Sequence, residues 1–282
     1  MPYFKHDGHR LAYTIYGEDG DSGRTTVLLP GLLFSQRMHI PLARELAERG
    51  NRVVTLDLLG HGKSARPDDM RVYGMEQFAQ QTIGLLDHLD IEDAVVGGTS
   101  LGANVTLSVA SIAPERLRGM IIEMPVLDNA LLGCAIAFTP LMVALTFGEP
   151  VMKIVQAGAR AVPSRGLPFW GDVMLDWLRQ DPAPSAAVIQ GLFFGRTAPP
   201  QSERETFETP ALVIGHPRDP VHPFSDADAL ARELRNGRLV DASSFFEMRL
   251  APERLTDEFA AFIDECWKPR RATPKRKRAA AK

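Results

Sequence analysis

Residues 94–102 read AVVGGTSLG, and within them Gly98-Thr99-Ser100-Leu101-Gly102 forms a G-x-S-x-G pattern. A short apolar run precedes the pattern, and a stretch with helical character follows it. A serine in a tight strand-to-helix turn is held in a strained conformation and needs small neighbours. Its hydroxyl is then exposed at a helix N-terminus, where the helix dipole favours developing negative charge. The sequence therefore predicts that Ser100 is a nucleophile at such a turn.

Short β-rich runs alternate with amphipathic stretches on both sides of this motif. The alternation predicts a mostly parallel sheet with helices on both faces. Strands are expected at residues 3–4, 10–16, 26–29, 52–57, 94–97, 119–123, 211–215 and 237–241. Helices are expected at residues 41–49, 75–89, 104–113 and 254–267. The segment between residues 125 and 210 has no strand pattern and is rich in Leu, Ala, Phe and Met, so a helical insertion is predicted there.

A chain of 282 residues suits one domain with an insertion. We predict an α/β core at 1–125 and 210–267, a helical cap at 126–209 and a disordered basic tail at 268–282. The tail carries eight Lys/Arg and no acid, whereas the rest of the chain has 24 basic against 35 acidic residues. Such an acidic body argues against nucleic acid as the main partner. The ordinary composition, 45% hydrophobic and 24% charged, excludes a mainly disordered or collagen-like chain.

Neither a membrane span nor a bound cofactor is expected. The N-terminus is polar and lacks a secretory pattern. Residues 130–147 come closest to a span but contain Gly133 and a central Pro140, so a buried or ligand-facing helical hairpin is predicted instead. Cys134 and Cys266 fit no metal spacing and are expected to be reduced thiols of a cytoplasmic protein. The seven histidines are scattered, so no metal site is predicted.

Several segments resemble the α/β-hydrolase superfamily in their order and spacing. They are the hairpin around Asp7-Gly8, LLPGLL at 28–33, DLLGHGKS at 57–64, GGTSLGAN at 97–104 and GHPRDPVHP at 215–223. The resemblance covers roughly residues 3–267 and implies an eight-strand, mostly parallel sheet flanked by helices, with a helical cap. DLLGHGKSARP is similar to a loop of capped esterase, lyase and peroxidase-like members. In that loop His61 would have a bracing role and not a catalytic one.

The resemblance also implies roles for individual residues. Ser100 matches the nucleophile, and the N–H groups of Leu101 and Leu32 match the oxyanion hole. Asp219 matches the acid that orients the catalytic histidine. Glu123 is a second candidate for the acid, because some members place it at the end of the strand predicted at 119–123.

The histidine that the superfamily usually carries after the last strand is missing. Residues 241–255 read DASSFFEMRLAPERL, and the last histidine of the chain is His222. A serine hydroxyl needs a base to remove its proton, so three interpretations remain. His222 could act as the base, although Asp219 lies only three residues before it and Glu123 or Glu247 is an alternative carboxylate. His39 or His216 could take the role, or no competent base exists.

The predicted cap is rich in large apolar side chains, which suits an apolar small-molecule substrate. Substrate-binding candidates are Leu33, Phe138, Met142 and Trp170, and polar side chains that could orient a substrate are Asp172, Asp176, Arg179 and Gln190. We expect a serine hydrolase that cleaves a small or medium apolar ester or thioester through an acyl-serine. The alternatives are a catalytically degenerate small-ligand-binding protein and a cofactor-free haloperoxidase or lyase. The cap could also form a homodimer surface.

Overall fold

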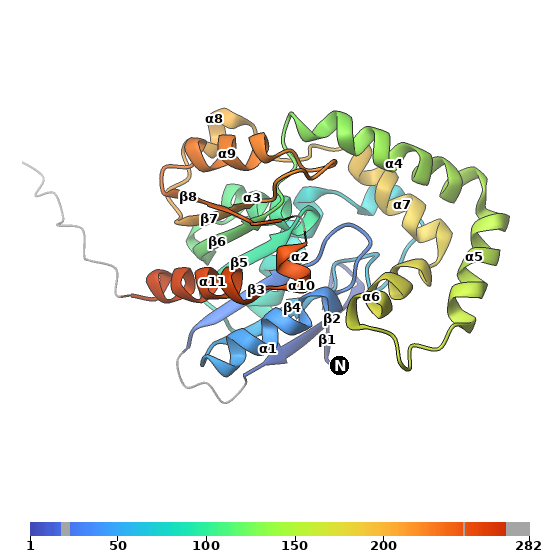
Figure 1. Ribbon diagram of the computed structural model, residues 1–282, viewed down its shortest axis with the longest axis horizontal. Coiled ribbons are helices and arrows are strands. Elements are labelled where there is room, and N and C mark those ends of the chain that lie inside the picture. The colour runs from blue at the N-terminus through green and yellow to red at the C-terminus, as the bar shows by residue number, and fades with distance from the viewer. Residues whose placement is uncertain (18–22, 245, 269–282) are drawn as a thin grey trace, which may run out of the picture.

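Eight strands form one sheet in the order β1-β2-β4-β3-β5-β6-β7-β8, with helices on both faces (Figure 1). The computed structural model describes residues 1–17, 23–244 and 246–268. β2 pairs antiparallel with β1 and β4, and all other neighbours are parallel. The predicted eight-strand, mostly parallel α/β sheet is thereby confirmed. The strands are β1 (Tyr3–His6), β2 (His9–Tyr16), β3 (Thr25–Leu29), β4 (Arg52–Leu56), β5 (Ala94–Thr99), β6 (Leu117–Glu123), β7 (Ala211–Gly215) and β8 (Gly237–Asp241).

Helices occupy both the connections around the sheet and a long insertion between β6 and β7. The connecting helices are α1 (Ile40–Glu48), α2 (Met75–His88), α3 (Leu101–Ile112), α9 (Phe224–Glu233), α10 (Glu247–Leu250) and α11 (Glu253–Cys266), with 3-10 turns η1 (Gln36–His39), η2 (Met70–Val72) and η3 (Pro114–Arg116). The insertion, all of whose residues are described, contains α4 (Ala130–Phe147), α5 (Glu149–Ala161), α6 (Phe169–Leu178), α7 (Pro182–Phe193) and α8 (Gln201–Arg204). Figure 1 shows α4 to α7 as an arc on one side of the sheet.

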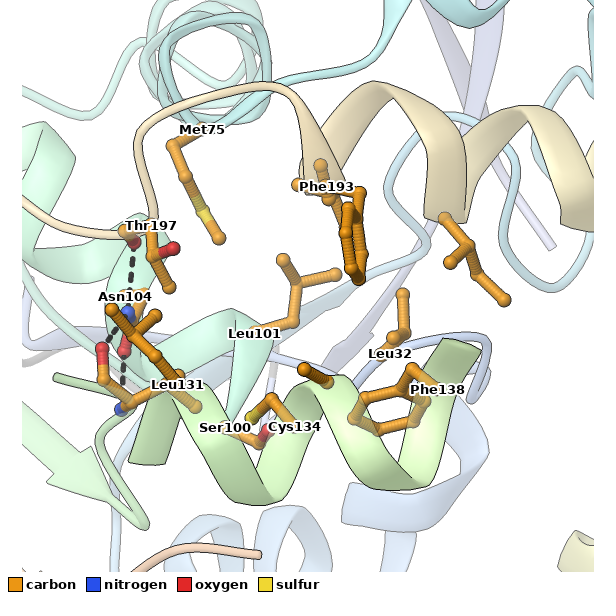
Figure 2. A pocket seen from close by; sticks show the side chains of 14 residues that line it. Leu32, Met75, Ser100, Leu101, Asn104, Leu131, Cys134, Phe138, Phe193 and Thr197 are labelled. Atoms are coloured by element: carbon orange, nitrogen blue, oxygen red, sulfur yellow. Dashed lines mark hydrogen bonds between the residues drawn. The ribbon is translucent and has the colours of Figure 1, made fainter. Parts of the chain in front are cut away.

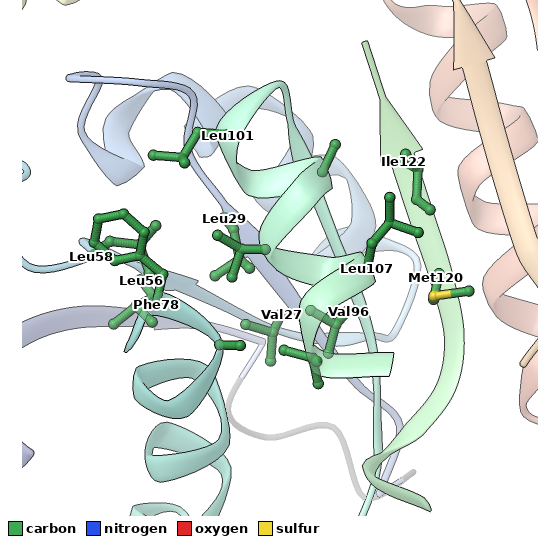
Figure 3. Close-up of a cluster of buried hydrophobic side chains, with 14 of the residues drawn as sticks. Val27, Leu29, Leu56, Leu58, Phe78, Val96, Leu101, Leu107, Met120 and Ile122 are labelled. Carbon is green, nitrogen blue, oxygen red and sulfur yellow. The ribbon is translucent and has the colours of Figure 1, made fainter. Parts of the chain in front are cut away.

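Two hydrophobic layers hold the sheet between its helices. Along β6, Met120 and Ile122 face the layer covered by α2, α3 and α9, while Ile121 faces the layer covered by α1 and α11. Figure 3 shows the first layer, in which Leu107 of α3 packs among the strand side chains. Because both faces are covered, the central strands are apolar throughout, as parallel strands usually are. This continuous burial explains why the strands could be predicted from the sequence.

The helix α4 differs from the expectation for its residues. A buried or ligand-facing hairpin was predicted, but one continuous helix runs through Pro140, and only 11% of its 18 residues are buried. Leu132, Ile136 and Phe147 are exposed to solvent, the last with 83% of its surface accessible. Proline lacks a backbone donor and tends to kink a helix, but it does not always end one. Among the described residues, α4 is the one helix that is long and apolar enough to cross a membrane.

Asp226 of α9 anchors the start of the insertion to the core. Its carboxylate accepts the N–H groups of Leu127 (2.8 Å) and Ala130 (3.0 Å) and the side-chain amide of Asn129 (2.8 Å). The first N–H groups of a helix lack partners within the helix, so a carboxylate there stabilises the beginning of α4. In the sequence Asp226 is an ordinary acid in the first turn of α9, so nothing there marks it as an anchor.

The predicted division of the chain can be placed on these elements. β6 ends at Glu123 and β7 begins at Ala211, so the predicted cap at 126–209 corresponds to the helices and loops between the two strands. The predicted basic tail at 268–282 lies, from residue 269 onward, outside the described residues.

Candidate active site

Ser100 lies in the turn between β5 and α3, at the carboxyl end of the sheet's central strands. Its backbone has φ 53° and ψ −108°, a region that L-residues rarely adopt. Its N–H donates to the Glu123 carbonyl (2.8 Å), and its own carbonyl accepts the Asn104 N–H (3.1 Å). Hydrogen bonds thus hold the turn on both sides of Ser100. The strained backbone at Ser100 agrees with the strand-to-helix turn predicted from the sequence.

Gly98 and Gly102 make this turn possible because each lies against other backbone atoms. A Cβ on Gly102 would come within 2.3 Å of the Leu29 carbonyl oxygen, and a Cβ on Gly98 within 2.7 Å of the same atom. Such distances are far below ordinary van der Waals contact. The first and last residues of the G-x-S-x-G pattern are therefore required by the close packing of α3 on β3.

His222 hydrogen-bonds to the serine hydroxyl. Its Nε2 lies 2.9 Å from Ser100 Oγ, and its Nδ1 lies 2.8 Å from Asp219 Oδ2. Because a carboxylate can only accept, Nδ1 carries the proton and Nε2 is free to accept the hydroxyl hydrogen of Ser100. The three side chains form the nucleophile–base–acid series that general-base activation of a serine needs.

A tight turn lets Asp219 reach the ring of His222 although the two residues are only three positions apart. The second carboxylate oxygen of Asp219 accepts the backbone N–H groups of Val221 (2.8 Å) and His222 (2.9 Å), which folds the chain back on itself. Burial raises the pKa of Asp219, but the hydrogen bond and charge of His222 and the two N–H groups outweigh it and hold that pKa below its ordinary value. Asp219 is therefore ionised at neutral pH and needs no help from another carboxylate.

Two backbone N–H groups are available for an oxyanion beside Ser100. Leu101 is the first residue of α3, and Leu32 lies in the loop after β3; both line the same pocket as Ser100. In the described part of the chain, neither N–H has a hydrogen-bond acceptor. Free donors at these two places are what a tetrahedral intermediate on Ser100 would use.

Glu123, the second candidate for the acid, is bound elsewhere. Its carboxylate accepts from His216 Nε2 (3.0 Å), from Arg249 (2.5 and 3.2 Å) and from the Thr99 hydroxyl. Burial alone would raise the pKa of Glu123, but the charges of Arg249 and His216 hold it far below its ordinary value. The structure places this carboxylate in a buried ion-pair cluster beneath the turn and not against His222.

The other candidate bases and the other candidate carboxylate also have partners of their own. Both ring nitrogens of His216 face oxygen acceptors, Glu123 and the Ser244 carbonyl (3.1 Å), so the ring has no lone pair to offer Ser100. His39 Nε2 bonds to the Leu29 carbonyl (2.8 Å). Glu247 pairs with Arg254 (2.8 Å). His61 is buried, with Nδ1 2.9 Å from the Leu59 carbonyl, in agreement with a bracing role.

The burial of His39 predicts a pH-dependent stability. Burial lowers the pKa of His39 to about 4, despite the Leu29 hydrogen bond and the charge of Glu123, which raise it. In the unfolded chain the imidazole titrates near 6.5, so unfolding takes up a proton between these values and stability falls as pH drops. We expect the unfolding free energy to decrease between pH 7.5 and 5, with His39 contributing up to roughly 3 kcal/mol over its full titration. Denaturant titrations of the wild type and His39→Gln measure this; equal pH slopes in the two proteins would contradict it.

The serine hydroxyl opens into an apolar pocket of about 290 Å³ (Figure 2). This volume lies at the lower end of ligand pockets. Burial raises the pKa of the Cys134 thiol to about 11, so that thiol stays protonated in the pocket wall. The lining residues come from the β3–α1 loop, α2, the β5–α3 turn, α4, α7 and the loops flanking the insertion: Leu32, Met75, Ser100, Leu101, Asn104, Val126, Leu131, Cys134, Ala135, Phe138, Ile189, Leu192, Phe193 and Thr197.

Three of the four predicted substrate-binding residues do not line this pocket. Phe138 does, from α4. Leu33 is instead buried in the core, Met142 packs against the same core cluster, and Trp170 donates its indole N–H to the Arg249 carbonyl on another side of the turn. For Met142 and Trp170, the sequence does not tell which side of α4 and α6 faces the serine. Leu33, in the loop after β3, lies in the core cluster instead.

Asn104 connects the serine turn to both ends of the insertion. Its amide nitrogen donates to the carbonyls of Val126 (2.7 Å) and Thr197 (2.8 Å), and its amide oxygen accepts the Val126 N–H (3.0 Å) (Figure 2). Asn104 is fully buried, and an asparagine two residues after the G-x-S-x-G pattern on an otherwise apolar helix was the available signal. Sequence reasoning missed it.

A family model described as alpha/beta hydrolase fold matches residues 26–138. The chain has the α/β-hydrolase fold. The crystal structure of the enol-lactonase from Burkholderia xenovorans LB400 superposes on this chain with a TM-score of 0.72, at 24% identity, covering 94% of this chain and 99% of that one.

Curated relatives agree with this assignment. The AB hydrolase superfamily protein YisY of Bacillus subtilis (strain 168) is 24% identical over 250 residues, 84% of this chain and 89% of YisY. A dihydrolipoyllysine-residue acetyltransferase component of the acetoin cleaving system from Pseudomonas putida is 36% identical over 108 residues, but the match spans only 26% of that relative. Further matches carry hydrolase names. Together they support a hydrolase enzyme on this fold.

Proposed function

We propose that this α/β-hydrolase chain is a serine hydrolase that cleaves a small or medium apolar ester or thioester through an acyl-serine. The observation that carries the proposal is the hydrogen-bonded series Ser100–His222–Asp219 at an apolar pocket. The same series argues against a catalytically degenerate binding protein, since the missing histidine after the last strand was the reason for that alternative. A haloperoxidase or lyase on the same fold would need the same groups, so product analysis has to distinguish them.

The geometry gives each residue one role in the mechanism. Ser100 Oγ attacks the carbonyl carbon while its proton passes to His222 Nε2. The oxyanion lies between the N–H groups of Leu101 and Leu32, where one such donor is worth about 3–4 kcal/mol. His222 then gives the proton to the leaving alcohol or thiol, and Asp219 stabilises the imidazolium in between. Water, activated by the same histidine, releases the acyl group and restores the serine.

Covalent labelling tests the proposal directly. We expect a fluorophosphonate to form one adduct on the wild type, which peptide mass spectrometry places on Ser100. Ser100→Ala should not be labelled, whereas Ser111→Ala, a change on the same helix whose hydroxyl bonds to Glu203, should be labelled like the wild type. A wild type that is folded by circular dichroism but takes no label would show that the serine is not activated.

Phe138 is expected to limit the length of the acyl group. It projects from α4 into the pocket, so Phe138→Ala should open space for additional methylenes (Figure 2). One methylene in an apolar pocket changes kcat/KM by about tenfold or more, so the ratio of kcat/KM for a p-nitrophenyl octanoate to that for the butyrate should rise by about tenfold. Phe147→Ala, an exposed phenylalanine on the same helix, is the control. An unchanged ratio in Phe138→Ala would mean that the acyl group binds elsewhere.

A further inference from the structure

A second cavity, of about 470 Å³, lies between the core and the insertion, away from the Ser100 pocket. Its core wall comes from η1 and the loop after β4, and its other wall comes from the ends of α5 and α6 and the loop before α7. Five of its lining side chains are cationic and three are acidic. This excess of positive charge is unusual in a body with 24 basic against 35 acidic residues.

The carboxylates of this cavity already have partners. Asp57 accepts the Gln36 N–H (2.6 Å), the Gln36 side-chain amide (3.0 Å) and the Lys63 N–H (2.9 Å). Asp176 pairs with Arg37 (3.0 Å), and Asp181 pairs with Arg160 (3.0 Å). These three carboxylates therefore form no ion pair with two of the cationic side chains, Lys63 and Arg66.

Arg66 and Lys63 are the lining cations that form no ion pair among the described residues, and Arg66 is the more buried of the two. Its Nη2 donates only to neutral oxygens, Gln180 Oε1 (2.6 Å) and Ser185 Oγ (3.3 Å), and its buried Nε has no acceptor. Within the described residues Arg66 forms no ion pair, and burial lowers its pKa from the ordinary value. Burying a guanidinium without a negative partner is costly unless something else supplies one. A second donor, the hydroxyl of Ser35, is also buried in this wall without an acceptor.

We propose that this cavity binds a small anion, a carboxylate or a phosphate group, on the guanidinium of Arg66. The two N–H groups of Arg66 Nη1, which donate to no acceptor among the described residues, form an unused fork for the oxygens of such a group. The exposed Lys63 ammonium is a further donor in the wall. The ligand would contact both the core and the insertion.

Two hydrogen bonds connect the site to the loop that carries Leu32. Gln180, which accepts from Arg66, donates its own amide to the Leu33 carbonyl in the loop that carries Leu32. An anion on Arg66 would therefore lie next to Gln180, whose amide holds the loop that carries Leu32. Binding itself can be measured without any enzymatic readout, so the proposal stands or fails independently of the proposed hydrolase activity.

Calorimetric titration of the full chain with inorganic phosphate and, separately, with succinate at constant ionic strength tests the proposal. We expect one saturable site for at least one of the two anions. The anion that binds shows whether the site takes a phosphate or a carboxylate group. Arg66→Met should weaken binding at least tenfold, and Arg66→Lys, which keeps the charge but loses the fork, should weaken it less. Arg71→Met, at an exposed arginine paired with Asp69, and Ser100→Ala should bind like the wild type.

Two outcomes would overturn the anion site. In the first, neither anion gives a saturable heat with the folded wild type. In the second, Arg66→Met binds the anion with the same affinity as the wild type. Should Arg66→Met fail to fold by circular dichroism, Lys63→Met replaces it, because an exposed lysine can be changed without disturbing the packing. That variant should also bind the anion more weakly, and unchanged affinity would count against the proposal. A bound anion should raise the Tm of the wild type by mass action.

Discussion

Replacing His222 with alanine is expected to lower kcat for an apolar p-nitrophenyl ester by about 10²–10⁴-fold, the contribution of a positioned general base. The reason is the single hydrogen bond of 2.9 Å between Ser100 Oγ and His222 Nε2. Without the imidazole, the hydroxyl has no acceptor for its proton as it attacks. The loss should appear in kcat, because the apolar pocket that binds the acyl group does not include this ring. Steady-state kinetics and the rate of fluorophosphonate labelling measure it.

Two controls separate the base from a structural histidine. Added imidazole should restore part of the rate of His222→Ala, because the deleted ring leaves a space beside Ser100. His216→Gln should keep nearly the wild-type rate when folded, since a glutamine amide can still donate to Glu123 in place of the ring bond of 3.0 Å. A full rate in His222→Ala together with a lost rate in His216→Gln would reverse the assignment of the base.

The fold was predictable because its signals are local. The strands that became β3 to β7 are short apolar runs bounded by turn residues, and all five are buried almost throughout. Ser100 was predictable for the same reason, since strand, glycines and helix follow one another within a few residues. By contrast, α4 is apolar on all sides, so its sequence does not reveal which side faces the pocket. For this reason the sequence did not place Met142 correctly, and the same ambiguity on α6 applies to Trp170.

The catalytic base could be reduced to alternatives but not assigned from the sequence. The sequence shows that the usual histidine is missing and that His222 follows Asp219 closely, which suggested poor geometry. What the sequence does not show is the turn in which one oxygen of Asp219 holds two backbone N–H groups and the other faces the ring. The roles of Asn104 and Asp226 were not predicted for a similar reason, because their hydrogen-bond partners lie 22 and 99 residues away in the sequence.

Changing Asp219 to asparagine should reduce kcat by about 10³-fold or more while leaving the fold stable, as when the orienting carboxylate of a Ser-His-Asp triad becomes an amide. One carboxylate oxygen accepts the N–H groups of Val221 and His222, and an amide oxygen can take that place. The new NH₂ group must then face His222 Nδ1, to which it donates. The ring proton is forced onto Nε2, so the imidazole can no longer accept the proton of Ser100.

Glu123→Gln is the matched change at the other candidate acid, and its effect should be the opposite. Glu123 balances Arg249 and His216 in a buried cluster, and breaking a buried ion pair from one side costs about 3–5 kcal/mol. We expect a lower free energy of unfolding with kcat close to wild type at temperatures where the variant is folded. If Glu123→Gln instead loses kcat and Asp219→Asn keeps it, the acid follows β6 and not β7. Kinetics and denaturant titrations on the two variants decide between these carboxylates, because one acts on the imidazole and the other on the packing beneath the serine turn.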